Sequence, residues 1–134
     1  MLRRTLLILG LALFAAPLAA AEEYTPGLVK ERLAAGEVVF VDFKASWCTT
    51  CARQERVIGS LKAANPAYES AVTFIDVDWD QWGNGDLARE LAIPRRSTLV
   101  VLQGDQELGR IVAGTAESDI KALMDKALDA ATAS

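Results

Sequence analysis

The chain has 134 residues, with 14 basic and 18 acidic side chains, two cysteines and no histidine. The acidic balance argues against nucleic acid and anionic lipid as partners, since both select basic surfaces. A structural zinc ion needs about four Cys or His ligands, which this composition does not supply. The length suits one domain with one hydrophobic core.

The first residues have the pattern of a secretory signal peptide. A basic start at Arg3-Arg4 leads into an apolar stretch from Thr5 to Ala16, and the small residues Ala19-Ala20-Ala21 follow. The apolar stretch is shorter than the roughly 20 residues that a membrane-spanning helix requires. We therefore predict a signal peptide over residues 1–21, cleaved after Ala21, and a periplasmic or secreted protein.

Residues 22–134 would then form the working domain. Loss of Arg3 and Arg4 leaves 12 basic residues against 18 acidic ones, a net charge near −6. Both cysteines stay in this part of the chain, and compartments outside the cytoplasm favour disulfides. Two cysteines with no others suggest that their bond is a reagent and not a structural staple.

The domain alternates strand-like and helix-like segments. Thr25 and Pro26 predict the start of a short helix and Gly36 its end, while Asn65-Pro66 predicts the end of a longer one. We expect strands at 38–44, 72–77, 98–102 and 107–112, and helices at 27–35, 48–64, 86–91 and 120–131. This alternation, which ends in a hairpin and a helix, predicts a three-layer α/β domain with a mixed central sheet.

The segment Trp47-Cys48-Thr49-Thr50-Cys51 contains both cysteines. It separates the strand at 38–44 from a helix whose expected apolar stripe is Val57, Leu61 and Ala64. At the helix start Cys48 would be an exposed thiol, and the helix dipole would favour its thiolate. Cys51, nearly one turn later, can close a small disulfide with it. A redox-active disulfide is the favoured interpretation, while half of a metal site and an idle pair stay open.

The chain resembles the thioredoxin family over nearly all of Val38 to Leu128. The strongest parts are Val-Asp-Phe-x-Ala-x-Trp-Cys-x-x-Cys over Val41 to Cys51 and the strand-hairpin segment from Ile93 to Gly114. The resemblance implies a thioredoxin-like α/β/α fold and disulfide exchange with protein partners, with no cofactor. Cys48 would attack the partner's disulfide and Cys51 would resolve the mixed disulfide. Trp47 matches the aromatic residue that covers the site and would contact the partner, with ordinary partial burial as the alternative.

Asp42 matches the family's buried acid beneath the second cysteine. Independently of the resemblance, a lone carboxylate in an apolar strand is costly unless it has a task or a partner. Burial should raise its pKa and suit it to exchange a proton with Cys51. Phe74 stands where many thioredoxins have a lysine paired with this acid, so Asp42 would act without it. An acid facing outwards at the strand end is the alternative.

Thioredoxins usually have a cis-proline before the strand that starts here at Thr98, and it helps to bind the partner chain. This chain has Ser97 in that place, and Pro94 lies three residues too early. A cis bond without proline costs roughly 3 kcal/mol, so we expect a trans Arg96–Ser97 bond. The resemblance places both residues at the partner-binding surface. Replacing Ser97 with proline should then restore the family's usual geometry.

Two further groups have more than one interpretation. Trp79 and Trp82, beside the loop Gly83-Asn84-Gly85, would either dock a partner or cover the edge of the core. The pair Arg95-Arg96 would either steer an acidic partner or be an ordinary solvated basic pair.

The sequence therefore predicts a thiol-disulfide oxidoreductase of the cell envelope, acting on protein disulfides as a monomer. A membrane-bound thiol donor would have to reduce it again. The absence of histidine between the cysteines removes one source of thiolate stabilisation found in strongly oxidising relatives, which favours a reductant. The alternative is a carrier of a soft ion such as Cu(I), held by two thiolates in space that the missing proline would leave beside the sulfurs.

Overall fold

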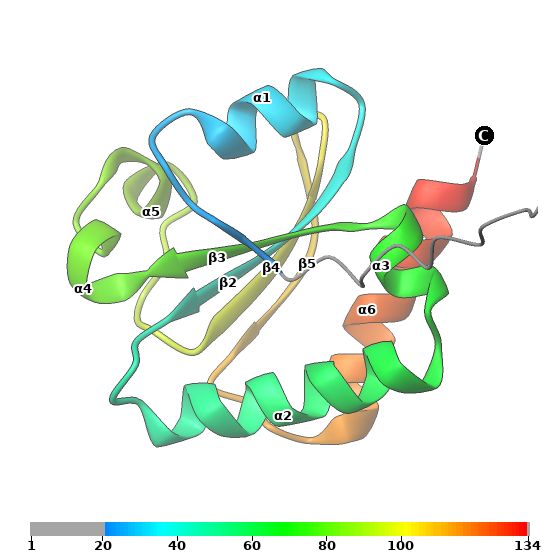
Figure 1. The fold of residues 1–134 in the computed structure, drawn as a ribbon. Helices are drawn as coiled ribbons and strands as arrows, with labels where there is room; N and C mark the ends of the chain where they lie inside the picture. Colours follow the sequence, from blue (N-terminus) through cyan, green and yellow to red (C-terminus); the bar gives the residue numbers. More distant parts are fainter. Residues whose placement is uncertain (1–20, 134) are drawn as a thin grey trace, which may run out of the picture.

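The computed structural model describes residues 21–133, so residues 1–20 of the predicted signal peptide lie outside the described part. A five-stranded sheet has the order β1-β3-β2-β4-β5 (Figure 1). Its strands are β1 Glu22–Glu23, β2 Val38–Lys44, β3 Thr73–Asp78, β4 Thr98–Gln103 and β5 Gln106–Val112. Strands β1, β3 and β2 run parallel, whereas β4 is antiparallel to both β2 and β5. The predicted mixed sheet is confirmed.

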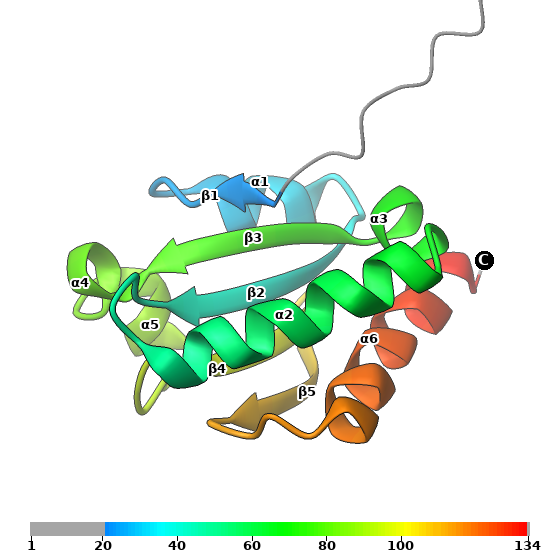
Figure 2. The same cartoon turned by 60° about the horizontal axis from the view of Figure 1, so that its bottom comes forward.

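Helices cover both faces of this sheet (Figure 2). They are α1 Leu28–Ala34, α2 Thr49–Ala64, α3 Ala67–Ala71, α4 Trp79–Trp82, α5 Asp86–Glu90 and α6 Glu117–Thr132. Side chains of α2, α3 and α6 form one core cluster with the sheet, while those of α1, α4 and α5 pack on the opposite cluster. The three-layer α/β/α architecture is therefore confirmed. Within residues 21–133, none of the helices is long and apolar enough to cross a membrane.

Strand β2 shows how the sequence builds these two clusters. Successive side chains of a strand point to opposite faces, so Val38 and Phe40 belong to the cluster under α2 and α6, and Val39 and Val41 belong to the other. All four side chains are buried. Asp42 lies two residues after Phe40, so its side chain points to the same face of the sheet as that of Phe40. Its carboxyl group is therefore directed to the face that α2 covers.

Several local predictions need correction. The first helix begins at Leu28, and its N-cap is Gly27 with φ +90°, not the Thr25 side chain. Instead, the Thr25 carbonyl accepts a 3.0 Å hydrogen bond from the Leu28 N–H. The helices α3 and α4 and the strand β1 were not expected. On α2, the buried residues are Cys51, Gln54, Ile58 and Leu61, whereas Val57 is half-buried and Ala64 is exposed.

Both edges of the sheet carry ion pairs. At one edge, Arg32 contacts both carboxylate oxygens of Glu22 on the two-residue strand β1, at 2.8 and 3.0 Å. At the other edge, Arg110 on β5 pairs with Glu107 and donates a 2.7 Å hydrogen bond to the carbonyl of Leu91. Charged side chains therefore occupy the outermost strand at each end.

Candidate active site

The two cysteines form a disulfide at the start of α2. Strand β2 ends at Lys44, and the Cys48 N–H donates to the Ala45 carbonyl at 3.1 Å, which turns the chain towards the helix. Cys48 is the N-cap residue, and its Sγ accepts a 3.1 Å hydrogen bond from the Cys51 N–H. The two Cα atoms are 5.2 Å apart. The predicted disulfide and its place at a helix N-terminus are confirmed.

Both cysteines are buried, and the expectation of an exposed Cys48 is wrong. Cys48 is 4% exposed and Cys51 is 2% exposed. They form a small cluster with Ala45, against which Trp79 packs. The N-cap position fixes only where the backbone lies, and these neighbours cover the sulfurs. A partner must therefore approach closely to reach Cys48.

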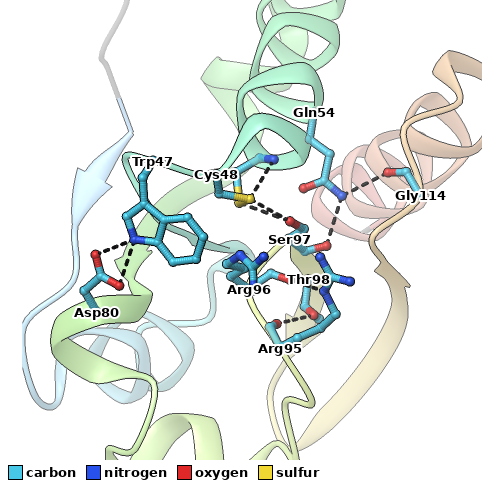
Figure 3. Close-up of a disulfide and its surroundings, with 10 residues drawn as sticks. Trp47, Cys48, Gln54, Asp80, Arg95, Arg96, Ser97, Thr98 and Gly114 are labelled. Atoms are coloured by element: carbon cyan, nitrogen blue, oxygen red, sulfur yellow. Dashed lines mark hydrogen bonds between the residues drawn. A yellow bond between two sulfur atoms is a disulfide. The ribbon is translucent and has the colours of Figure 1, made fainter.

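Ser97 lies directly against the disulfide (Figure 3). Its Oγ is 3.1 Å from Cys48 Sγ and 3.1 Å from Cys51 Sγ, and the residue is fully buried. The Arg96–Ser97 peptide bond is trans, as predicted, and Ser97 has φ +64°. This value lies in the left-handed region that residues other than glycine seldom adopt. The Ser97 backbone therefore has to be held in this conformation by its neighbours.

Hydrogen bonds on both sides of Ser97 hold its backbone in this conformation. Its N–H donates to the Phe43 carbonyl at 2.7 Å, and its carbonyl accepts from the Ala113 N–H at 2.8 Å. The Gln54 Nε2 donates to the carbonyls of Ser97 at 3.0 Å and Gly114 at 2.9 Å. The sequence interpretation missed Gln54. Its spacing three residues after Cys51, which places both on one helix face, is the signal that points to it.

Trp47 forms an exposed platform beside the disulfide. The residue is 57% exposed, and its Nε1 donates to the two carboxylate oxygens of Asp80 at 2.9 and 3.1 Å. The Arg96 guanidinium lies 4.4 Å from the centre of the indole ring. Figure 3 shows Arg96 between Trp47 and the Ser97 segment. The structure thus brings together Trp47, Cys48, Arg96 and Ser97, as the sequence predicted.

Trp79 and Trp82 belong to the edge of the core, one of the two interpretations that the sequence left open. Both residues are half-buried and pack against the cluster on the side of α1 and α5. Trp79 meets Phe43 edge to face, and Trp82 meets Tyr24 in the same way. Neither side chain forms an exposed platform like that of Trp47.

Asp42 lies in a charged cavity beneath α2. The cavity has a volume of about 360 Å³, and its polar lining residues are Glu23, Asp42, Lys44, Glu55, Lys62 and Asp76. Asp42 is 5% exposed, and within residues 21–133 its Oδ1 has no hydrogen-bond partner. Burial, and then the charge of Asp76, raise the pKa of Asp42 to about 7. The predicted burial and its direction on the pKa are confirmed.

Lysines do reach this cavity, although Phe74 occupies the position expected for one. The Lys62 Nζ lies 3.9 Å above the Phe74 ring, and the Lys44 Nζ lies 3.6 Å from an oxygen of Asp76. Both lysines lower the pKa of Asp42, against the larger effects of burial and Asp76. Neither cysteine lines the cavity. The role of Asp42 in proton exchange with Cys51 stays a prediction.

The arrangement suits two-electron sulfur chemistry. A dithiol at a helix N-terminus has one sulfur next to backbone donors and a second sulfur one turn away. Among the described residues, no group of three or more His, Cys, Asp or Glu side chains is placed to hold a metal ion.

Comparison with known proteins gives matches over most of the chain. The family model described as Thioredoxin matches residues 20–126. Thioredoxin H2-1 of Oryza sativa subsp. japonica is 33% identical over 76 residues, which are 57% of this chain and about half, 51%, of that protein.

Solved structures extend the likeness to the whole fold. Trxlp from Edwardsiella tarda EIB202 is 28% identical with a TM-score of 0.67, covering 78% of this chain and 98% of that one. A thioredoxin of Malassezia sympodialis is 24% identical with a TM-score of 0.70, covering 84% and 95%. At that identity the second likeness concerns the fold alone.

Proposed function

Because this chain belongs to the thioredoxin family, we propose that it is a thiol-disulfide oxidoreductase that acts on protein disulfides. The observation that carries the proposal is the Cys48–Cys51 disulfide at the N-terminus of α2, beside the exposed indole of Trp47. The helix terminus stabilises a thiolate at Cys48. The indole and Arg96 supply a surface on which a partner chain can lie.

The exchange has two steps, written for the reduced protein. The Cys48 thiolate attacks one sulfur of the partner's disulfide, so a bond forms between Cys48 and the partner, and the partner's other sulfur leaves as a thiolate that takes up a proton. Cys51 then loses its proton and attacks Cys48 Sγ, which releases the partner's remaining sulfur. The partner gains two electrons and two protons, and the Cys48–Cys51 disulfide is formed.

Asp42 is the proposed acceptor of the Cys51 proton. Its pKa of about 7 lies where a general base works best at neutral pH. Since the cysteines do not line the cavity of Asp42, the proton would pass through water, for which this cavity has ample room.

We place the protein in the cell envelope, as a monomer that acts mainly as a reductant and is recharged by a membrane-bound thiol donor. The leader-like pattern of residues 1–21 supports the location. Since β1 starts at Glu22, cleavage after Ala21 would leave every strand whole. The absence of histidine between the cysteines supports the direction of electron flow. N-terminal sequencing of protein recovered from the cell envelope should start at Glu22, and a Met1 start there would contradict the cleavage.

The structure gives no support to the rival function, a Cu(I) carrier. That function depended on free space beside the sulfurs where the proline is missing, yet the Ser97 hydroxyl occupies that space at 3.1 Å from each sulfur.

Turnover on a model protein disulfide such as insulin, with dithiothreitol as donor, tests the proposal. Wild-type protein should reduce it catalytically, and Cys48→Ser should abolish turnover. Cys51→Ser should accumulate a mixed disulfide through Cys48. A redox titration against glutathione then gives the direction of flow. Stoichiometric, tight Cu(I) binding without disulfide turnover would replace this proposal with its rival.

A further inference from the structure

We propose that Ser97 is a further catalytic residue, whose hydroxyl donates a hydrogen bond to the Cys48 thiolate of the reduced protein and follows the negative charge during exchange. The inference rests on the proposed disulfide chemistry, and it assigns to Ser97 a task that a proline in its place could not perform. Proline presents only a hydrocarbon ring to the sulfurs.

The donor in this contact is settled by chemistry. Disulfide sulfurs carry no hydrogen, so between Ser97 Oγ and the two sulfurs only the hydroxyl can donate. Its oxygen is equally far, 3.1 Å, from Cys48 Sγ and Cys51 Sγ. A single hydroxyl proton can turn to either sulfur without movement of the backbone.

The hydroxyl is also held in place and kept from bulk water. Ser97 is fully buried, and its backbone is fixed by the Phe43 carbonyl on one side and by Gln54 and Ala113 on the other. A donor that is already oriented in a buried site interacts strongly with a charge, because no water has to be displaced when the charge forms.

Reduction creates that charge. When two electrons enter the disulfide, the bond breaks and Cys48 keeps a negative charge, while Cys51 takes up a proton. The Cys51 N–H already lies 3.1 Å from Cys48 Sγ, and the Ser97 hydroxyl is a second donor. Hydrogen bonds to a charged sulfur are stronger than those to a neutral one. Ser97 therefore stabilises the reduced, ionised form more than the disulfide.

The same hydroxyl serves the second half of the exchange. Once Cys51 has lost its proton, the charge lies on Cys51 Sγ, the other sulfur within reach of Ser97 Oγ. The hydroxyl keeps its own proton throughout. It changes only the sulfur to which it points as the Cys48–Cys51 bond forms and the partner's sulfur leaves with the electron pair.

The test compares Ser97→Ala with Ser97→Gly. Both lose the hydroxyl, but glycine adopts φ +64° without strain whereas alanine keeps the side-chain carbon. We expect the pKa of Cys48, measured from the pH dependence of its alkylation by iodoacetamide, to rise by about one unit in both variants. At a pH above the Cys48 pKa of both wild type and variant, the variant's thiol-disulfide equilibrium with glutathione should lie about tenfold further towards the Cys48–Cys51 disulfide, or about 30 mV. At acidic pH this difference between variant and wild type should vanish.

Thr98→Ala is the matched control. It removes the neighbouring buried hydroxyl, which donates to the Arg95 carbonyl at 2.7 Å and contacts neither sulfur, so the pKa of Cys48 should not move. An unchanged alkylation profile in both Ser97 variants would overturn the inference. So would a shift confined to Ser97→Gly, because that result assigns the effect to the backbone.

The alkylation profile needs no protein partner, which separates this inference from the proposed function. Wild-type protein that fails to reduce insulin, with a raised Cys48 pKa in both Ser97 variants, would contradict the proposed activity and support the Ser97 contact. Normal turnover with an unmoved pKa would do the reverse.

Discussion

Asp42 on β2 and Asp76 on β3 are direct partners in the parallel register, and both line the cavity beneath α2. Two neighbouring carboxylates in one partly closed space oppose each other's ionisation. Burial is the first cause of the raised pKa of each, and for Asp42 the charge of Asp76 is the second. Asp42 therefore changes charge near neutral pH, where an ordinary aspartate is already ionised.

Replacement of Asp42 by asparagine should stabilise the folded protein at alkaline pH. Because the pKa rises from 3.8 in the unfolded chain to about 7 in the fold, the folded protein holds a proton that the unfolded chain releases, and stability falls as pH rises through this interval. Asp42→Asn should raise the free energy of unfolding by about 2 kcal/mol at pH 8, after allowance for an unpaired amide. The gain should be absent near pH 4. Urea unfolding of the oxidised protein at pH 8 and near pH 4 measures the free energy of unfolding at each pH.

Asp105→Asn is the control for that experiment. Asp105 is exposed in the turn between β4 and β5. Its replacement should therefore leave unchanged the difference between the free energies of unfolding measured at pH 8 and near pH 4. An equal gain for Asp42→Asn at both pH values would show that the stabilisation does not come from ionisation.

Two charges at the rim of the cavity should tune the pH dependence of exchange in opposite directions. Lys44 lowers the pKa of Asp42 and Glu55 raises it, and the two side chains are themselves paired at 2.7 Å. Lys44→Met should therefore move the pH midpoint of the resolving step upwards, and Glu55→Gln should move it downwards. Stopped-flow release of a partner from the mixed disulfide gives the midpoint. Shifts of the same sign in both variants would exclude Asp42 as the group that titrates.

Replacement of Ser97 by proline should damage the protein, and the sequence-based expectation that it restores the family's geometry needs correction. Proline has φ near −65° and no N–H, whereas Ser97 has φ +64° and donates to the Phe43 carbonyl at 2.7 Å. We expect Ser97→Pro to lower the free energy of unfolding by about 3 kcal/mol. Ser97→Gly, which suits the backbone, should not. Equal stability of the two variants would mean that this segment can take another conformation.

The Trp47 platform should affect partner binding more than stability. Since the residue is 57% exposed, Trp47→Ala should change the free energy of unfolding by less than about 1 kcal/mol. The KM for a protein disulfide should rise, with little change for a small aromatic disulfide. Trp47→Phe keeps a ring beneath Arg96 and loses the bond to Asp80, so its KM should be intermediate. Equal loss on both substrates would place Trp47 in the chemistry instead.

The sequence predicts best what depends on continuous patterns. The apolar run at 38–44 corresponds to β2 residue for residue, because a strand that is buried on both faces forms a nearly continuous run of apolar residues. The five-residue helix α3 was missed, since Asn65-Pro66 also marks an ordinary helix end and so short a segment shows no period. The cysteine spacing, together with the strand pattern before it and the helix pattern after it, placed the disulfide at the helix start.

Contacts between distant segments were harder to foresee. The register that sets Asp42 beside Asp76 depends on how two strands pair, which alternation along one strand does not reveal. The approach of Ser97 to both sulfurs depends on a positive φ, and serine has no strong preference for it. Gln54 was missed because its hydrogen-bond partners are carbonyls of segments far along the chain.

The ion pairs at the outermost strands bear on self-association. An open strand edge can add a strand from another molecule and seed aggregation. Here a strand added at either edge would meet charged side chains, with Glu22 paired to Arg32 at one edge and Arg110 paired to Glu107 at the other. Since β1 and β5 are each two strands away from β2, the strand that leads to the cysteines, we expect concentrated solutions to resist edge-to-edge growth in both the oxidised and the reduced protein.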